Sequence, residues 1–583
     1  MFGYLLKLIT MAKPAFSSIR ILILLGFFSF AVCSGCRRQN VSSSAAVPDA
    51  WYRNSMIYNL DVATYKDSDG DGTGDFRGLI SKMGYLDSLG VSVLWLSPFQ
   101  PSPGMDDGYD VTDYYGINPK LGNMEDFAAF IAAAKAHHIS VIMDMVLNHT
   151  SIEHPWFRKS REDSTAGFHS RYVWSKKKPR DYNKGMAFQG VQTETWTYDE
   201  VAHAYYFHRF YDFQPDLNYQ NKTVQAEAVK ILQYWIGKGV QGFRLDAVPF
   251  IIDVPESGAQ NPAHLFGVLD SLVRGAKERD QNALLLGEAN VMPKETRDYF
   301  GENGQRLQMM FNFYANEYLF YSLAHEKPES FVKALQLTRE KPGNSQWAYF
   351  LRNHDEIDLG RLTGKQRREV YARFGPEKTM QLYGRGIRRR LAPMLHNDKQ
   401  IRMAYSLLYS LPGTPVIRAG EEIGMGDDLT LRERLSVRTP MQWDATANAG
   451  FTNAEEPFRP VISMGEYSYR KINVKTEQQD ERSLLNFIRH LISVRRSNPE
   501  IGTADWRILA TGNDAVLAIA YSSGRGQLLT VHNFSAAKVA FSLQEQGSFT
   551  DLLTGKLIVP DGKKVLLDGY GELWLQSHKR DAK

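Results

Sequence analysis

Three acidic residues stand where short apolar runs end, and they are the side chains of this sequence best placed to do chemistry. They are Asp246 in GFRLDAV, Glu288 in ALLLGEAN and Asp355 in FLRNHDE. A carboxyl group at the end of a buried strand lies against low-dielectric surroundings, which push neighbouring pKa values apart into acid and nucleophile roles. Together the three acids predict catalysis on glycosidic bonds.

The neighbours of two of these acids predict which catalytic role each acid has. Arg244 and Asp246 are two residues apart on a predicted strand and face the same side, and a guanidinium favours the charged carboxylate that a nucleophile needs. Glu288 follows the aliphatic run 284–286, whose desolvation raises a carboxyl pKa, as a general acid and base requires. In a retaining mechanism these two carboxyl groups lie about 5 to 5.5 Å apart, and the nucleophile forms a covalent glycosyl intermediate.

Each of these residues, taken alone, also has a structural explanation. An Arg and an Asp two apart on a strand often form an ion pair, and a Glu after an apolar run can begin the next helix. The occurrence of all three acids in order along one chain favours catalysis over these explanations.

A regular alternation of short apolar runs with amphipathic stretches must position the acids. Apolar residues recur at helical spacing in MEDFAAFIAAAKAHH and TVQAEAVKILQYWIGKG. Eight strands separated by such helices predict an α/β fold, the closed (β/α)8 TIM barrel. The predicted strands are 57–61, 91–96, 140–145, 242–246, 283–288, 307–312, 348–353 and 415–419.

The catalytic barrel is predicted to span residues 51–500, well above the usual 250 or so for this fold, so it must carry insertions. A polar, aromatic stretch without helical period, at about 150–213, predicts an inserted subdomain after strand three that overhangs the active face. A second, Arg-rich excursion covers 358–396. Alternating runs such as AVLAIAYSS predict a C-terminal β-sandwich at 501–583.

Residues 1–50 predict an export signal and a linker. Basic residues precede an apolar run at 21–32 that is too short for a comfortable membrane span. Ser34 and Gly35 before Cys36 resemble the lipobox of bacterial lipoproteins, which predicts export across the cytoplasmic membrane and a periplasmic or lipid-anchored protein. Simple cleavage and an uncleaved anchor are the alternatives. Both cysteines of the chain lie here, so the mature domain is expected to have no disulfide.

The formal net charge of +4 does not imply a nucleic-acid partner. Five of the 69 basic residues lie in the first 38 positions, which contain no acids. The rest of the chain carries 64 basic against 65 acidic residues and is near neutral, without the basic excess that nucleic acid attracts.

The segment DSDGDGTGD at 67–75 has the spacing by which a loop wraps calcium. Acids stand at its positions one, three, five and nine, and a carbonyl is available at position seven: Asp67, Asp69, Asp71, Asp75 and Thr73. Gly78 stands where an EF-hand has its bidentate Glu, so structural calcium or magnesium is expected without an EF-hand, the alternative being a solvated acidic turn. No thiol or histidine cluster suggests zinc, and no organic cofactor is expected.

Four separated motifs in a fixed order resemble the α-amylase superfamily, glycoside hydrolase family 13, over nearly all of the mature chain. They are DMVLNH at 144–149, GFRLDAV at 242–248, GEAN at 287–290 and RNHDE at 352–356. The resemblance implies retention and makes Asp355 the third acid, which stabilises the oxocarbenium-like transition state. It also implies sugar contacts from Tyr109, His149, Arg244 and His354, and a second calcium site at Asn148, Asp216 and Asp253 with carbonyls near Phe250 and Ile251.

Further segments are similar to the trehalose synthases of this superfamily, which isomerise maltose to trehalose: DDGYDVTDYYGINP, FYDFQPDLN, GIRRRLAP, EEIGMGDD and VRTPMQW. They imply maltose, trehalose or short α-glucans as substrates. Arg418, Ala419 and the segment up to Val437 depart from that subfamily's sequence, so an exported α-glucosidase or α-amylase-type hydrolase is the alternative. A non-catalytic sugar-binding or assembly protein is a remote third, because all three acids are present.

Overall fold

The computed structural model describes residues 50–165, 167–253, 264–523, 526–543 and 547–577. The predicted export signal and Cys36 lie outside the described residues and stay predictions. Over the described part of the chain, no helix combines the length and the apolar character needed to cross a bilayer.

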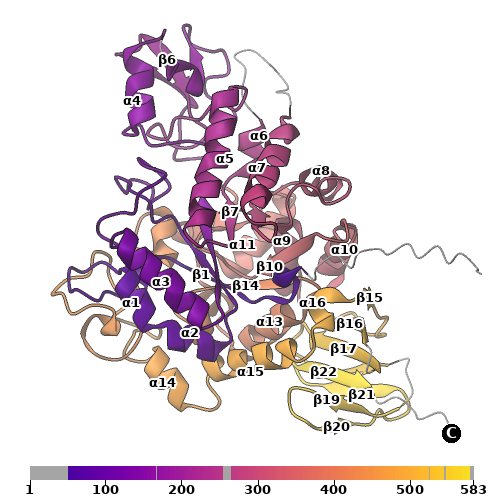
Figure 1. Ribbon diagram of the computed structural model, residues 1–583. Coiled ribbons are helices and arrows are strands. Elements are labelled where there is room, and N and C mark those ends of the chain that lie inside the picture. The colour runs from indigo at the N-terminus through magenta and orange to yellow at the C-terminus, as the bar shows by residue number, and fades with distance from the viewer. Residues whose placement is uncertain (1–49, 166, 254–263, 524–525, 544–546, 578–583) are drawn as a thin grey trace, which may run out of the picture. The chain divides into compact units, whose positions relative to one another are not determined.

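The predicted barrel is confirmed: eight parallel strands close on themselves, and helices surround them (Figure 1). In barrel order the strands are β1 (Ile57–Leu60), β2 (Val93–Leu96), β3 (Ser140–Met145), β7 (Gly242–Leu245), β8 (Leu284–Gly287), β9 (Met309–Phe311), β10 (Gln346–Phe350) and β14 (Thr414–Arg418). β7 and β8 are buried along their whole length. Both end one residue before the predicted bounds, so Asp246 and Glu288 are the first residues of the loops that follow.

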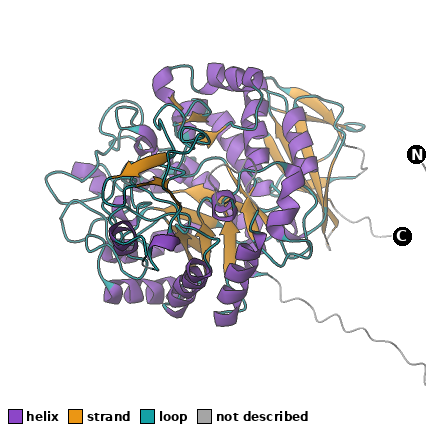
Figure 2. Cartoon of the chain, turned by 90° about the horizontal axis from the view of Figure 1, so that it is seen from above, coloured by secondary structure: helices purple, strands orange, loops and turns teal. Residues whose placement is uncertain are grey.

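The helices around the barrel begin at recognisable caps. Asn123 and Asp126 form a reciprocal capping box at the start of α3, and the side chain of Asn221 accepts from the Thr223 amide at the start of α5. Figure 2 shows the barrel helices around the central strands. These helices are α1 (Phe76–Ser81), α2 (Met83–Leu89), α3 (Met124–Ala136), α5 (Lys222–Gly237), α6 (Val248–Ile252), α7 (Phe266–Arg279), α8 (Thr296–Phe300), α9 (Phe313–His325), α10 (Glu329–Leu337), α13 (Asp398–Ser410), α14 (Val474–Gln479), α15 (Leu484–Arg496) and α16 (Glu500–Thr503).

An inserted subdomain follows β3. It holds a three-stranded sheet in the order β4 (Trp174–Ser175), β6 (Ala204–Phe207), β5 (Trp196–Asp199). It also contains helix α4 (Pro155–Glu162). This helix was not predicted because it is short and half of its residues are charged. The ring of Phe157 on α4 stacks on Trp174 at 5.6 Å and anchors the helix on the small sheet.

The Arg-rich segment before the last barrel strand contains two helices and a short three-stranded sheet. Its elements are β11 (Ile357–Asp358), α11 (Gly364–Phe374), β12 (Gln381–Leu382), β13 (Gly386–Ile387) and α12 (Leu391–Leu395). β12 and β13 pair antiparallel and form a hairpin, whose turn contains Tyr383 and Gly384 in the left-handed region.

The C-terminal strands form an antiparallel domain. A six-stranded sheet has the order β15 (Trp506–Ile508), β16 (Val516–Ser523), β17 (Gly526–Asn533), β22 (Glu572–Ser577), β19 (Phe549–Asp551), β20 (Leu557–Ile558), and β18 (Val539–Ser542) pairs with β21 (Lys564–Leu567). Side chains of both sheets share one buried core. The domain rests on α13 of the barrel, where Trp574 Nε1 donates to Ser406 Oγ at 3.0 Å, and its strands are yellow in Figure 1.

Candidate active site

Three strand ends bring the predicted acids together. Asp246 follows β7, Glu288 follows β8 and Asp355 lies in the loop after β10, and all three line one cavity of about 760 Å³. In a parallel barrel the carboxyl ends of all strands meet at the same face, so acids distant in sequence converge there.

Arg244 on β7 holds two of these acids. Its Nη1 lies 2.6 Å from Asp246 Oδ1, and its Nη2 lies 2.6 Å from Glu288 Oε1. Nη1 also lies 2.5 Å from Oδ1 of the fully buried Asp144 on β3. Because Arg244 itself is 1% exposed, its charge needs these partners, and sharing it keeps the two carboxyl groups close, as a retaining mechanism requires.

The surroundings of the acids shift their pKa values apart. Burial, with the nearby charge of Asp246, raises the pKa of Glu288 to about 7. Burial raises the pKa of Asp246 to about 6, and although Arg244 opposes this, the net direction is upward rather than the lowering expected from the Arg244 pair. Asp246 and Glu288 titrate as one interacting pair, so at intermediate pH one of the two carboxyl groups is charged and the other is protonated.

Asp355 differs from the other two acids. Burial alone would raise its pKa, but the neighbouring His354 and the guanidinium groups of Arg434 and Arg438 together outweigh burial and hold the pKa of Asp355 far below its usual range. Arg434 Nη1 lies 3.0 Å and Arg438 Nη2 lies 2.8 Å from Asp355 Oδ1. Asp355 is therefore charged at every working pH, which suits stabilisation of a cationic transition state.

The predicted sugar contacts Tyr109 and His354 lie against each other. The ring of Tyr109 is parallel to that of His354, with 5.7 Å between centroids, and Tyr109 Oη lies 2.6 Å from His354 Nε2. Tyr109 Oη also donates to Asp144 Oδ2 at 3.0 Å. Tyr109 lines the cavity and can carry a sugar face, whereas the buried His354 is not among the lining residues and reaches the cavity through Asp355, 3.1 Å away.

His149 lies at the cavity wall as the neutral imidazole. Burial lowers the pKa of His149 to about 4, and its Nε2 donates to the backbone oxygen of Tyr109 at 2.9 Å. Its ring packs edge-on against Phe210 of the inserted subdomain. His149 therefore ties the loop after β3 to the loop that carries Tyr109.

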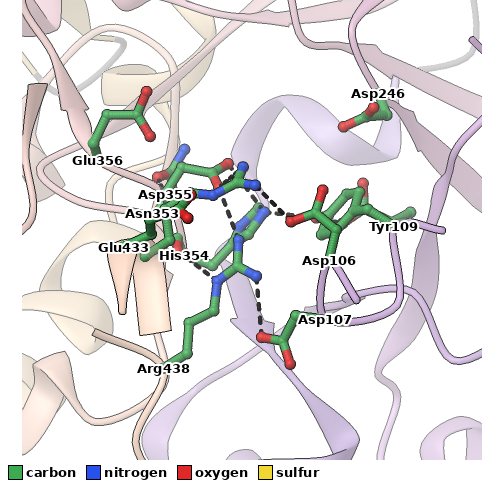
Figure 3. A network of polar contacts seen from close by, with 12 residues as sticks. Asp106, Asp107, Tyr109, Asp246, Asn353, His354, Asp355, Glu356, Glu433 and Arg438 are labelled. Atoms are coloured by element: carbon green, nitrogen blue, oxygen red, sulfur yellow. Dashed lines mark hydrogen bonds and ion pairs between the residues drawn. The ribbon is translucent and has the colours of Figure 1, made fainter. Parts of the chain in front are cut away.

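Five charged residues of the site were absent from the predicted set. Asp144 holds Arg244, and Asp106 pairs with Arg434 at 2.7 Å, while Arg438 bridges Asp355 to Asp107. Figure 3 shows Asp106, Asp107 and Tyr109 on one side of the guanidinium groups and the segment from Asn353 to Glu356 on the other. The paired acids in DDGYD and the arginines of RLSVRTP could have indicated charged residues of the site. The sequence of a loop does not reveal which of these charges lie together in the fold.

The outer wall of the cavity comes from the two long excursions. Residues 185–189 and Phe210 of the inserted subdomain line it, together with Arg385 of the β12–β13 hairpin. Arg385 Nη1 donates to the backbone oxygen of Ala187 at 2.7 Å, which joins the hairpin to the subdomain. The two segments thus form a joined outer wall of the cavity.

The predicted calcium loop gathers three of its acids. Carboxylate oxygens of Asp67, Asp69 and Asp71 lie within 4.8 Å of one another, with Asp67 buried and the other two exposed. Asp75 instead accepts from the Gly78 amide at 2.8 Å and caps α1, and from Ser68. Thr73 donates its amide to Asp71 at 2.6 Å. The three clustered carboxylates offer the hard oxygen ligands that calcium or magnesium prefers.

The second predicted set of ligands already has a cationic neighbour. Asn148 hydrogen-bonds to Asp216, and burial raises the pKa of Asp216 to about 7. Asp253 contacts the imidazole of His264. The guanidinium of Arg209, held over the ring of Phe250 at 4.8 Å, interacts with the charges of both Asp216 and Asp253.

Comparison with known proteins agrees with this geometry. Residues 60–504 match the family described as alpha amylase, catalytic domain. The chain is 36% identical to a trehalose synthase/amylase TreS of Mycobacterium tuberculosis over 92% of both chains, and 37% identical to a trehalose synthase of Pimelobacter over 83% of this chain and 87% of that one. Among solved structures, an α-amylase from H. orenii superimposes with a TM-score of 0.72 at 30% identity, covering 90% of this chain and 99% of the other.

Proposed function

Because the chain belongs to the α-amylase family, we propose that it is a retaining α-glucoside-active enzyme that isomerises maltose to trehalose. The observation that carries the proposal is the sharing of Arg244 by Asp246 and Glu288 in a cavity whose outer wall comes from two long insertions. The similarity to trehalose synthases over most of both chains supports the choice of substrate.

The first half of the reaction cleaves maltose. Asp246 Oδ attacks the anomeric carbon of the non-reducing glucose, while Glu288 donates its proton to the glycosidic oxygen. The bond between that carbon and oxygen breaks, which leaves a glucosyl ester on Asp246 and a free glucose in the cavity. Asp355, charged and held by Arg434 and Arg438, stabilises the positive charge that develops on the ring.

The second half decides the product. Glu288, now ionised, removes the proton from the anomeric hydroxyl of the retained glucose, whose oxygen attacks the glucosyl ester and regenerates the Asp246 carboxylate. The product is the 1,1-linked disaccharide. If water attacks instead, two glucose molecules leave, so retention of glucose separates an isomerase from a hydrolase.

Hydrolysis is the second candidate, and the end of β14 favours it. Arg418, at the position where the chain departs from trehalose synthases, is 2% exposed and donates to Asn59 Oδ1 at 3.0 Å. A buried cation therefore stands at the end of β14, beside β1 and outside the residues that line the cavity. The relative named trehalose synthase/amylase and the predicted export signal are also compatible with an exported α-glucosidase or α-amylase-type enzyme.

A structural calcium or magnesium ion is part of the proposal. Asp67, Asp69 and Asp71 would hold it in the loop before α1 and stabilise the fold, with no part in the chemistry. The second set, Asn148, Asp216 and Asp253, stays a prediction from the resemblance, because Arg209 already supplies positive charge there.

The test is to incubate the purified protein with maltose and follow the anomeric protons by NMR. Trehalose as the main product supports the isomerase. Glucose alone means that water reaches the glucosyl ester, and the protein is then an α-glucosidase. The Asp246→Asn variant serves as the control for contaminating activity.

A further inference from the structure

Three chain segments that are far apart in sequence meet at one carboxylate above the active site. Tyr211 follows the subdomain strand β6, Tyr383 lies in the turn of the β12–β13 hairpin, and Glu433 opens the 3₁₀ helix η7 (Glu433–Val437) after β14. The hydroxyls of Tyr211 and Tyr383 both donate to Glu433 Oε2, the latter at 2.7 Å. We call these three residues the clasp.

The clasp supports a wall of the cavity. Phe188, which lines the cavity, stacks on Tyr383 with 4.5 Å between centroids and an angle of 29°, and packs on Tyr211 at 4.8 Å. The guanidinium of Arg434 lies over the same ring at 4.9 Å. Phe188 is therefore enclosed between the clasp and a residue that pairs with the catalytic Asp355.

The clasp is one peptide bond away from the acid network. Arg434 follows Glu433 directly and ion-pairs with Asp106 and Asp355. Figure 3 shows Glu433 beside this network. Glu433 and Tyr383 have φ values of 46° and 53°, a left-handed conformation that is unfavourable for residues with a Cβ and persists where surrounding contacts hold it. The clasp is one of these contacts, beside the bonds that the backbone oxygen of Glu433 accepts from Arg388 and Ser436.

We propose that the clasp keeps the roof closed over the glucosyl ester and so determines whether retained glucose or water reacts with it. Tyr211, Tyr383 and Glu433 act as positioning residues: they touch Phe188 and Arg434, and do not enter the chemistry. A closed roof holds the released glucose near Asp246 and excludes water, whereas an open roof lets glucose leave and water enter. This inference rests on the proposed isomerase function and names the residues that decide its product.

The experiment removes single clasp groups without changing side-chain size. Tyr211→Phe, Tyr383→Phe and Glu433→Gln are each incubated with maltose in the presence of ¹³C-labelled glucose, and trehalose, free glucose and label in trehalose are measured. The matched control is Tyr198→Phe on β5 of the same subdomain, whose hydroxyl is outside the clasp and whose side chain is 41% exposed. Thermal unfolding of each variant checks the fold.

We expect the ratio of trehalose to glucose to fall on the order of tenfold in each clasp variant, the effect of losing one hydrogen bond to a charged group. Label from external glucose should appear in the remaining trehalose, while the kcat for maltose consumption changes little. Tyr198→Phe should match the wild type. A changed product ratio with an unchanged kcat would show that the clasp acts on the closure of the cavity. A general loss of stability would lower kcat as well.

Two results would overturn the proposal, and they differ. If the wild type makes trehalose and the clasp variants show the same product ratio and no more label, the clasp has no role and the isomerase function stands. If the wild type makes glucose alone, the proposed isomerase function is wrong, and so is the proposal that the clasp keeps the released glucose in the cavity.

Discussion

Arg244 offers one guanidinium nitrogen to Asp246 and the other to Glu288, each at 2.6 Å. One buried cation thereby sets the distance between nucleophile and general acid and opposes the upward effect of burial on both pKa values. A third carboxylate, that of Asp144 on the neighbouring strand β3, lies 2.5 Å from the same guanidinium. This contact fixes the orientation of the guanidinium.

Replacing Arg244 with Gln should therefore damage catalysis through both acids. Without the guanidinium, the pKa values of Asp246 and Glu288 rise further, and kcat/KM should fall by about 10²-fold or more. The acidic limb of the pH profile should move to higher pH. Kinetics from pH 4 to 9 test this, with Arg274→Gln on the exposed face of α7 as control. An unchanged acidic limb would contradict the prediction.

The pH dependence of the wild type should be bell-shaped and narrow. Activity rises as Asp246, with a pKa of about 6, loses its proton, and falls as Glu288, with a pKa of about 7, loses its own. Because the two groups interact, the limbs report the pair rather than the single residues. Initial rates of kcat/KM against pH measure both limbs. A plateau extending above pH 9 would exclude Glu288 as the general acid.

Variants of the two acids should separate their roles. Asp246→Asn should abolish turnover of every substrate. Glu288→Gln should lose on the order of 10²- to 10⁴-fold with maltose, but much less with α-glucosyl fluoride, because fluoride leaves without a proton. Circular dichroism confirms the fold of each variant. Turnover of maltose at the wild-type rate in either variant would favour a sugar-binding protein with another source of activity.

The contribution of Asp144 and Asp216 to folding stability should decrease as pH rises from about 4 to 7, whereas buried His149, whose pKa is lowered to about 4, contributes in the opposite direction. The folded-state pKa values of Asp144 and Asp216 are raised to about 6 and about 7, so their stabilising contribution is complete below the unfolded value and is lost as pH rises through these folded values. Urea unfolding at several pH values measures the trend. The free energy of unfolding of Asp216→Asn, relative to that of the wild type, should rise as pH increases through about 7, because the variant lacks the Asp216 contribution that the wild type loses.

Removal of divalent ions should lower the melting temperature. Asp67, Asp69 and Asp71 lose the cation that would offset their mutual repulsion, so a chelator should destabilise the wild type and added calcium should restore it. Asp69→Asn and Asp71→Asn should respond less, whereas Asp568→Asn, an exposed acid of the C-terminal domain, should respond as the wild type does. Calorimetry with and without chelator gives the answer. Equal shifts in all variants would exclude this loop as the site.

Cys36 provides a test of the predicted lipid anchor. In a bacterial host, the wild type should incorporate labelled palmitate and partition with membranes, and Cys36→Ser should do neither. Cys33→Ser is the matched control. Label in neither protein would leave simple cleavage or an uncleaved anchor as the explanation of the apolar segment.

The sequence by itself determined the barrel and its three acids. All eight strands were predictable because parallel strands are buried on both faces and appear as apolar runs between amphipathic helices. Their bounds shifted where residues such as Asp246 and Glu288 leave the ladder and enter loops. Helix α4 was missed because a short surface helix lacks a continuous apolar stripe, and its cap at His154 was the remaining signal.

Only the tertiary structure decided which charges meet. The pairs of Arg434 with Asp106 and of Arg438 with Asp107 join residues more than 300 positions apart, and the clasp joins three loops. The net direction of the Asp246 pKa was likewise decided by burial and by Asp144 and Asp355, which no local pattern reveals. The physical reason is that hydrophobic periodicity depends on residues close together in the sequence. The electrostatic field at a site and the walls of a cavity depend on groups that only folding brings together.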